Sequence, residues 1–488
     1  MDLHEYAALD AVGLRELIVS RQVSAAEVED VARRALGRAD EELNALTMPP
    51  FETALDHDPD GPLGGVPFLI KDSGPFARGV PFTFGSRGVL GAVAAEDHDL
   101  MRRFRAAGLA GLGQTTAPEL GLNFTTESVR YGPTRNPWAL GRSPGGSSGG
   151  SAALVAAGAV PIAHGNDGGG SIRIPASCCG LVGLKPSRGR TPSGPFAGEV
   201  GFGQTVEFAL TRTVRDAAHL LDAVSATPIG DKSVAPRPLR PYVRELTAGP
   251  ERLRVAVTTA SWSGTSVDPQ VAEVTADAGR VLEWMGHTVT EAAPPFDPGD
   301  LVEGLVLGAY AAGAAFLLLP FPIATERWEA VSRSVFAESA AATLLDVARA
   351  LDAQNRVTRT AAAFLTAHDL LLTPTIGHLP APLGSFAYDS PSTIRDWLRR
   401  LFDYGPFTAP FNISGHPAIS LPLGQSREGL PIGVQLVAAH GREDLLLRTA
   451  AHLEQAVPWS GRGPSVLTDR PGSRSSDRRP GVSPRDAG

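Results

Sequence analysis

Cysteine is nearly absent from this chain of 488 residues, and its scarcity excludes two kinds of protein. The only two cysteines are the neighbours Cys178 and Cys179. Two adjacent thiols cannot form a disulfide framework, and they are too few for a zinc site made of four cysteines. The composition fits a reducing compartment, so we expect a cytoplasmic location.

The sequence also lacks three other features: a basic block outside the C-terminal tail, a leader segment and a long apolar run. Lys and Arg number 44 against 52 Asp and Glu, and the net charge of −8 argues against a nucleic-acid-binding surface. The N-terminus lacks a basic segment followed by an apolar one, so we expect no signal peptide. The most apolar stretch, residues 305–324, is interrupted by Pro320 and Pro322. It is short for a membrane span, so we expect a buried helix there and neither a membrane nor a nucleic acid as partner.

The remaining sequence alternates between strand and helix patterns. Ser24 and Glu27 form a capping box before an amphipathic helix pattern, and the apolar run Val66–Ile70 is typical of a buried strand that ends at Lys71. Further strands are expected at 109–114, 253–259, 287–292, 369–375, 417–424 and 431–438, and further helices at 97–108, 268–286 and 442–456. This alternation predicts an α/β fold with a partly parallel, buried sheet.

Two segments lack any such pattern. Residues 226–250 are rich in proline and are expected to form a surface connection. Residues 469–488 are polar and rich in Pro, Gly, Ser and Arg, so we expect a disordered tail after one large domain over residues 1–468.

Residues 143–175 contain two serines that are each set among glycines, Ser147 and Ser171. Glycine costs backbone order, so two such clusters suggest that something approaches the chain closely at both. A phosphate cradle would need G-x-x-x-x-G-K-[ST] or G-x-G-x-x-G, and neither pattern fits. GGSSG formally matches a nucleophile elbow with Ser147 as nucleophile, but the prolines at 137 and 144 make a poor strand before it.

A third interpretation uses both serines and a lysine. A buried lysine with a lowered pKa can serve as a base. Lys71 could therefore take a proton from Ser147, while Ser147 takes one from the nucleophile Ser171. The glycines before Ser171 would then offer N–H groups to an oxyanion. A fourth interpretation is that the glycines only allow close backbone packing, and the residues alone leave all four open.

The same residues resemble the motifs of the amidase signature family. Residues 144–187 are similar to the long central signature, and GGVPFLIKD at 64–72 is similar to the family's lysine motif. Further similar stretches are GQTTAPELG at 113–121, LLLTPT at 370–375, FTAPFNISGHPAISLPLG at 407–424 and PIGVQLVA at 431–438. Together the similarity spans residues 5–460, and it includes some similarity to hydrolases of cyclic nylon-type dimers.

This resemblance implies a single catalytic domain over residues 1–468, with a central mixed sheet covered by helices on both faces. It implies that Lys71 is a neutral base, that Ser147 is a bridging serine after a cis peptide bond, and that Ser171 is the acyl-forming nucleophile. The implied oxyanion hole consists of the backbone N–H groups of Gly168, Gly169, Gly170 and Ser171. No metal or organic cofactor is needed.

Several neighbours are expected to support these groups. Asp167 and Arg173 are expected to hold the loop as buried ion partners, and Ser148 to be a supporting hydroxyl. Asn166 stands where the family usually has threonine, which puts the support of the triad in question. His164 is expected to be a core histidine with satisfied hydrogen bonds, and both cysteines to be small buried apolar groups.

The implied activity is hydrolysis of a small-molecule amide, of the general amidase type, through an acyl-enzyme. Two alternatives remain: a subunit resembling the amidotransferase that amidates misacylated tRNA, and a catalytically inactive scaffold. A homodimer is left open. Substrate choice is expected to depend on residues 300–345 and 376–405, with 305–328 forming a hydrophobic wall.

Overall fold

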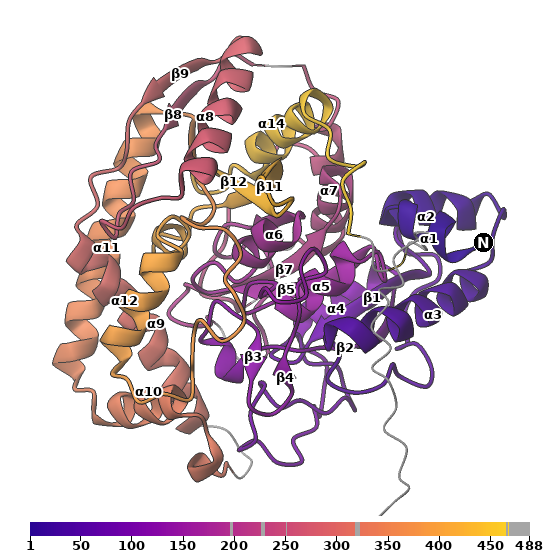
Figure 1. The fold of residues 1–488 in the computed structure, drawn as a ribbon, viewed down its shortest axis with the longest axis horizontal. Helices are drawn as coiled ribbons and strands as arrows, with labels where there is room; N and C mark the ends of the chain where they lie inside the picture. Colours follow the sequence, from indigo (N-terminus) through magenta and orange to yellow (C-terminus); the bar gives the residue numbers. More distant parts are fainter. Residues whose placement is uncertain (196–198, 226–229, 250, 318–322, 465–466, 468–488) are drawn as a thin grey trace, which may run out of the picture.

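One large mixed sheet, formed by ten strands of the described chain, runs through the molecule (Figure 1). The computed structural model describes residues 1–195, 199–225, 230–249, 251–317, 323–464 and 467, so the tail predicted at 469–488 lies outside the described residues. In spatial order the strands are β2 (Leu109–Thr115), β1 (Val66–Lys71), β5 (Ile162–Asp167), β7 (Val206–Thr211), β6 (Val182–Lys185), β11 (Ala418–Gln425), β12 (Pro431–Ala438), β10 (Leu370–Pro374), β8 (Arg254–Val257) and β9 (Thr288–Glu291).

Parallel and antiparallel pairings divide this sheet into three parts. Strand β1 pairs in parallel with β2 and β5, and β8 pairs in parallel with β10 and β9. The strands between them pair antiparallel, from β5 through β7, β6, β11 and β12 to β10. The α/β class and the mixed sheet predicted from the sequence are therefore confirmed.

Helices surround the sheet. They are α1 (Leu3–Ala8), α2 (Ala11–Val19), α3 (Ala25–Leu43), α4 (Asp99–Ala106), α5 (Gly149–Ala156), α6 (Arg173–Cys179), α7 (Val214–Val224), α8 (Pro269–Trp284), α9 (Pro298–Leu317), α10 (Ala330–Ala341), α11 (Leu344–Ala367), α12 (Ile394–Tyr404), α13 (Ala409–Ile413) and α14 (Glu443–Ala456). Three short 3-10 helices, η1 (Glu119–Gly121), η2 (Tyr242–Arg244) and η3 (Thr325–Arg327), and a small hairpin, β3 (Glu127–Ser128) with β4 (Gly132–Pro133), complete the described elements.

Two layers of helices bury the middle of the sheet. Helices α5 and α6 pack against each other and against the middle strands, while α7, α14 and α8 form a second contacting row. Strands covered on both faces are mostly apolar. Strands β1 and β12 are accordingly buried at every position, and their few polar side chains, such as Lys71 at the end of β1, are buried with them.

Local sequence signals account for several of these elements. The capping box predicted at Ser24 is present, since the Ser24 hydroxyl accepts from the Glu27 N–H and the Glu27 carboxylate accepts from the Ser24 N–H. The helix and strand expectations over 253–292 and 369–456 are confirmed by α8, β8 to β12 and α14. The connection predicted at 226–250 lies partly outside the described residues, and its described part contains η2.

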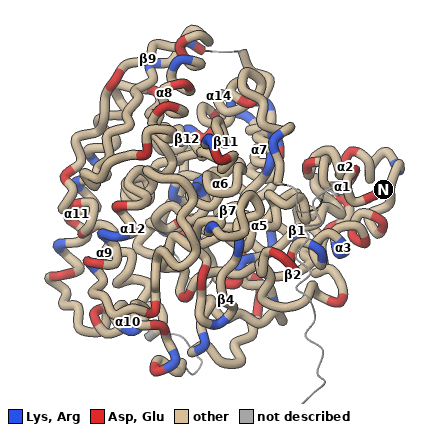
Figure 2. The backbone as a smooth tube through the Cα atoms, in the orientation of Figure 1, with Lys and Arg blue, Asp and Glu red and all other residues tan. Residues whose placement is uncertain are grey.

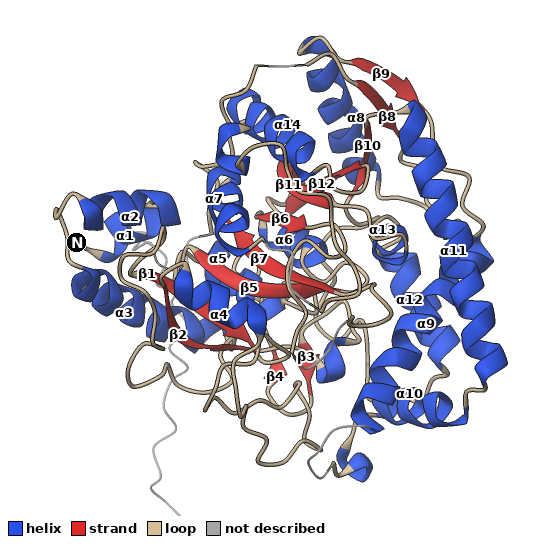
Figure 3. Ribbon diagram, turned by 180° about the vertical axis from the view of Figure 1, so that it is seen from behind, coloured by secondary structure: helices blue, strands red, loops and turns tan. Residues whose placement is uncertain are grey.

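Helices α9 to α12 gather at one side of the molecule, opposite the N-terminal helices α1 to α3 (Figures 1 and 3). By length and composition α9 is apolar enough to cross a membrane, and about half of that stretch (56%) is buried inside the protein. Acidic and basic residues are interspersed over the molecule (Figure 2), and the two acidic residues of α9 pair with neighbouring helices. Asp300 pairs with Arg356 of α11 at 2.6 Å and Glu303 with Arg395 of α12 at 2.8 Å. The helix predicted from residue 305 is therefore present and packed in a helical layer, while residues 318–322 lie outside the described chain.

Candidate active site

The predicted site residues meet where two strands end and two helices begin. Lys71 is the last residue of β1, and Asn166 and Asp167 end the adjacent parallel strand β5. Ser148 precedes α5, and Ser171 lies two residues before α6. In parallel sheets the carboxyl ends of neighbouring strands share one edge, where ligands commonly bind.

Three side chains surround the amine of Lys71. Nζ donates to Ser147 Oγ at 2.7 Å, to Ser148 Oγ at 3.0 Å and to Asn166 Oδ1 at 2.6 Å. Lys71 and Ser147 are each only 1% exposed. The structure therefore brings Lys71 together with the predicted bridging serine and with two of the four predicted supporting residues.

Burial changes the acidity of this amine. Removal from water disfavours the ammonium form and lowers the pKa of Lys71 to about 7. The carboxylates of Glu207, Asp167 and Asp72 act in the opposite direction and raise the pKa of Lys71, but by less than burial lowers it. A substantial fraction of neutral amine is thus present near neutral pH, unlike in a surface lysine.

The two glycine-framed serines lie on adjacent loops. The peptide bond between Gly146 and Ser147 is cis, as the family resemblance implies. The Ser148 N–H donates to the Ser171 carbonyl at 3.3 Å and so joins the loops. Among the hydrogen bonds of the described residues, none links the Ser147 and Ser171 hydroxyls, and Ser171 is 5% exposed.

The loop over residues 168–171 presents backbone N–H groups. Within the described chain these N–H groups donate no hydrogen bond, while the carbonyls of Gly169 and Gly170 accept from Thr408 Oγ1 and the Ile174 N–H, both at 2.7 Å. Gly170 has a φ of 141°, and a Cβ there would lie 2.5 Å from Thr408 Oγ1. The position therefore requires glycine, and the loop is held through its carbonyls with its N–H groups available to an acceptor.

A buried ion pair anchors this loop to the sheet. The Asp167 carboxylate accepts from the Ile172 N–H and from the Arg173 guanidinium, and both side chains are fully buried. Although burial raises the pKa of Asp167, the charge and hydrogen bonds of Arg173 hold it well below its usual range. Arg173 also donates to Asn412 Oδ1 at 2.5 Å, to Gln435 Oε1 at 2.7 Å and to the Thr408 carbonyl at 2.9 Å.

Asn166, at the position where the family usually has threonine, spans the site. Its Oδ1 accepts from Lys71 at 2.6 Å, and its Nδ2 donates to Ser73 Oγ at 3.1 Å. The side chain of threonine is shorter than that of asparagine. The longer Asn166 side chain contacts both Lys71 and Ser73 in the turn after Lys71.

Two other sequence expectations have mixed outcomes. Cys178 and Cys179 are fully buried as expected, and burial raises the pKa of Cys178 to about 12. Each thiol also has a weak hydrogen-bond partner, the Tyr404 hydroxyl for Cys178 and the Pro144 carbonyl for Cys179. His164 is fully buried, but neither ring nitrogen has a hydrogen-bond partner in the described chain. The expected core position of His164 is therefore confirmed, whereas the expected hydrogen bonds of its ring are wrong.

Apolar side chains from distant segments face the glycine loop. A Cβ on Gly169 would lie 3.5 Å from Phe124 and 4.0 Å from Leu305 of α9. The backbone of 122–124 is held by α12 and by Phe386, since Trp397 Nε1 donates to the Leu122 carbonyl and Asn123 Nδ2 to the Phe386 carbonyl. Sequence reasoning missed Phe124, whereas Leu305 lies in the segment that it assigned to a hydrophobic wall.

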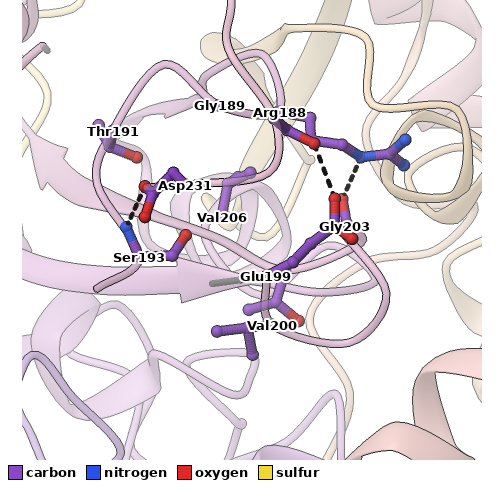
Figure 4. A pocket seen from close by; sticks show the side chains of 11 residues that line it. Arg188, Gly189, Thr191, Ser193, Glu199, Val200, Gly203, Val206 and Asp231 are labelled. Carbon is purple, nitrogen blue, oxygen red and sulfur yellow. Dashed lines mark hydrogen bonds between the residues drawn. The ribbon is translucent and has the colours of Figure 1, made fainter. Parts of the chain in front are cut away.

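The described cavities lie elsewhere. The cavity in Figure 4, lined by Thr191, Glu199 and Asp231 among others, has a volume of about 10 Å³, which is room for about one water molecule. A cavity of about 230 Å³ lies at the far ends of α5 and α6, next to Gly158 and Cys179. No three metal-ligating side chains are grouped within the described residues.

This fold and this site belong to a known class of amide hydrolase. The Amidase family model matches residues 35–447, and the chain belongs to the amidase signature family, as its motifs predicted. The chain is 39% identical over 482 residues to 6-aminohexanoate-cyclic-dimer hydrolase of Paenarthrobacter ureafaciens, which covers 94% of this chain and 97% of that protein. A solved structure of 6-aminohexanoate cyclic dimer hydrolase superposes with a TM-score of 0.89 at 38% identity and covers 94% and 99% of the two chains. Acylamidase of Rhodococcus erythropolis is 36% identical over 417 residues, or 83% of this chain and 84% of that protein.

Proposed function

We propose that this chain hydrolyses small-molecule carboxamides, including linear or cyclic amide oligomers, through an acyl-enzyme formed on Ser171. The proposed catalytic residues are Lys71, Ser147 and Ser171. The observation that carries this proposal is the set of three partners around the amine of Lys71.

These partners favour a defined direction for the lone pair of the neutral amine. A carbonyl oxygen such as Asn166 Oδ1 only accepts, and Ser148 Oγ accepts from Lys71 while it donates to the Asn166 carbonyl at 3.4 Å. The two N–H bonds of the neutral amine are thus used by Asn166 and Ser148. The lone pair is left for the Ser147 hydroxyl at 2.7 Å, so Lys71 serves as base toward Ser147.

Ser147 then accepts a proton from Ser171 as Ser171 Oγ attacks the amide carbon. The Ser171 hydroxyl has no described hydrogen-bond partner, so it can rotate toward Ser147 when substrate is bound. The N–H groups of Gly169, Gly170 and Ser171, with that of Gly168, stabilise the oxyanion. The ammonium of Lys71 returns a proton through Ser147 to the leaving amine, and water releases the acyl group by the reverse route.

The substrate class follows from the surroundings of the loop and from the relatives. Phe124 and Leu305 present hydrocarbon beside the oxyanion loop, which suits an aliphatic or aromatic acyl chain. Two of the relatives are named as a 6-aminohexanoate-cyclic-dimer hydrolase and as an acylamidase. We therefore propose apolar-chain amides and lactam dimers as the first substrates to test.

Replacement of the nucleophile tests the proposal. Wild-type protein should be labelled by a fluorophosphonate, and it should open the ring of 6-aminohexanoate cyclic dimer to the linear dimer or release the aromatic amine from an acyl anilide. Ser171→Ala should lose both signals, whereas Ser177→Ala, a serine in α6 that donates no proton to the proposed triad, should keep the labelling. Labelling of Ser171→Ala would refute the nucleophile assignment.

Two outcomes would favour the alternatives. Activity on glutamine alone, dependent on a copurified tRNA-binding subunit, would favour an amidotransferase subunit. Absence of labelling and of turnover across alkyl, aryl and cyclic amides would favour an inactive scaffold.

A further inference from the structure

Glu207 is a buried carboxylate near Lys71 that the proposed mechanism does not use. Glu207 lies on β7 directly opposite Asn166 of β5, and its side chain is only 13% exposed. A Cβ added to Gly74 would lie 2.9 Å from Glu207 Oε1, so the carboxylate lies against the turn that follows Lys71. Glu207 Oε2 has no hydrogen-bond partner among the described residues.

Two imidazoles flank this carboxylate at distances longer than a hydrogen bond. His164 Nε2 of β5 lies 3.6 Å from Glu207 Oε2, and His98 Nδ1, at the start of α4, lies 3.8 Å from it. Burial lowers the pKa of His164 despite the nearby carboxylate, so His164 is neutral at neutral pH. The pKa of Glu207 is lowered by the histidines and by Lys71, against the effect of burial, so the carboxylate is ionised.

The other carboxylates that face Lys71 are compensated locally. Asp167 of β5 is paired with Arg173 through two hydrogen bonds to the guanidinium. Asp72, next to Lys71, accepts from the Thr83 N–H, from Thr83 Oγ1 and from the Gly85 N–H. Glu207 has neither an arginine nor a set of donors in the described chain, and buried polar atoms without partners are rare enough to need an explanation.

We propose that Glu207, held between His164 and His98, is a positioning residue whose negative charge stabilises the ammonium form of Lys71. This inference rests on the proposed function, because it assumes that Lys71 is the base. The ammonium forms each time the relay takes a proton from Ser171, so a buried negative charge nearby stabilises the state that the reaction passes through. The same charge raises the pH below which Lys71 stays protonated and the relay stops.

The sign of the effect follows from this arrangement. Glu207 favours the charged amine and raises the pKa of Lys71, so its neutralisation lowers that pKa. The acid limb of the profile of kcat/KM against pH should therefore move to lower pH in Glu207→Gln. For a base with a pKa of about 7, about a tenth of the amine is free at pH 6. A downward shift of about one unit would raise this to about half, a fivefold gain in the fraction of plateau activity retained.

The experiment compares pH profiles of four variants and of wild-type protein. Glu207→Gln and Glu207→Ser remove the charge with and without the bulk of the side chain, and both should shift the acid limb downward. Glu207→Asp keeps the charge and should restore a limb near that of wild type. Glu291→Gln is the matched control, because it neutralises an exposed carboxylate on β9, an edge strand of the same sheet that is far from β7 in the strand order.

The pH dependence of fluorophosphonate labelling of Ser171 gives a second readout that needs no substrate. An acid limb that is unchanged or higher in both neutral variants would overturn the role of Glu207. A shift of equal size in Glu207→Asp would overturn it too, since the charge would then not be the cause. The proposed function fails separately, if wild-type Ser171 is not labelled or if Lys71→Ala keeps the wild-type acid limb.

Discussion

The buried pair of Asp167 and Arg173 should stabilise the fold mainly through mutual compensation of charge. Both side chains are fully buried, and two hydrogen bonds of 2.9 and 3.0 Å join them. Asp167→Asn leaves the Arg173 guanidinium without a counter-charge. Arg173→Met leaves the Asp167 carboxylate without a counter-charge. Loss of one partner of a buried pair costs about 3–5 kcal/mol, so each single variant should lose that much of its free energy of unfolding.

The double variant distinguishes this explanation from a simple loss of packing. With both charges gone, no uncompensated charge remains, so the double variant should be more stable than the sum of the two single losses by about 2 kcal/mol. Urea unfolding at pH 7 measures these differences, provided that tryptophan fluorescence and far-ultraviolet circular dichroism give coincident transitions. Additive losses, or a cost below about 1 kcal/mol for Asp167→Asn, would refute the argument.

The pair also has a defined pH dependence. The pKa of Asp167 is lower in the folded protein than in the unfolded chain, where carboxyl groups titrate near about 4. A group whose pKa is depressed by folding contributes stability that is present above its unfolded pKa and is lost as the pH falls through its folded pKa. The difference between wild type and Asp167→Asn should therefore be constant from neutral pH down to about pH 5 and shrink only below that.

Three further predictions concern catalysis. Because burial lowers the pKa of Lys71 to about 7, kcat/KM of the wild-type enzyme should fall about tenfold per pH unit below neutral, and a rate that stays flat to pH 5 would contradict this. Asn166→Asp would place a carboxylate where the amide oxygen now lies 2.6 Å from Lys71. The acid limb of its profile of kcat/KM against pH should therefore move upward by at least about one pH unit, whereas the acid limb of Asn166→Thr should stay closer to that of wild type. Gly170→Ala should lower kcat by about 100-fold or more, because the Cβ would lie 2.5 Å from Thr408 Oγ1 and displace the N–H groups of the proposed oxyanion hole. Gly141→Ala has open space and should be neutral. Wild-type turnover in Gly170→Ala would show that these N–H groups tolerate displacement.

Much of the fold could be read from local patterns. Strand β12 has the bounds that its apolar run predicts, and α3 begins at the predicted capping box, because both signals depend on neighbouring residues. The helices α10 to α12 were not predicted from sequence. They lie at 330–341, 344–367 and 394–404, outside the stretches that resemble the family motifs, and their packing against α9 depends on tertiary contacts.

The site divides in the same way. The positions of Lys71, Ser147 and Ser171 follow from motifs in which each residue is close in sequence to its glycines or its strand. Glu207 gave no such signal, because a glutamate in a short strand is ordinary and only the register of β7 with β5 places it near Lys71. Phe124 is a similar case, since only packing beside Gly169 and Gly405 makes it a candidate substrate contact.

The amino-acid sequence by itself determined which groups are candidates for the reaction: a lysine at the end of an apolar strand, two serines, and glycines whose backbone N–H groups could face a substrate. Tertiary structure alone decided how these groups behave. The pKa of Lys71 depends on the removal of water by α5 and neighbouring strands, and on the charge of Glu207, which lies 136 positions further along the chain. Desolvation and Coulomb interactions depend on distance in space, so they are defined only once the chain has folded.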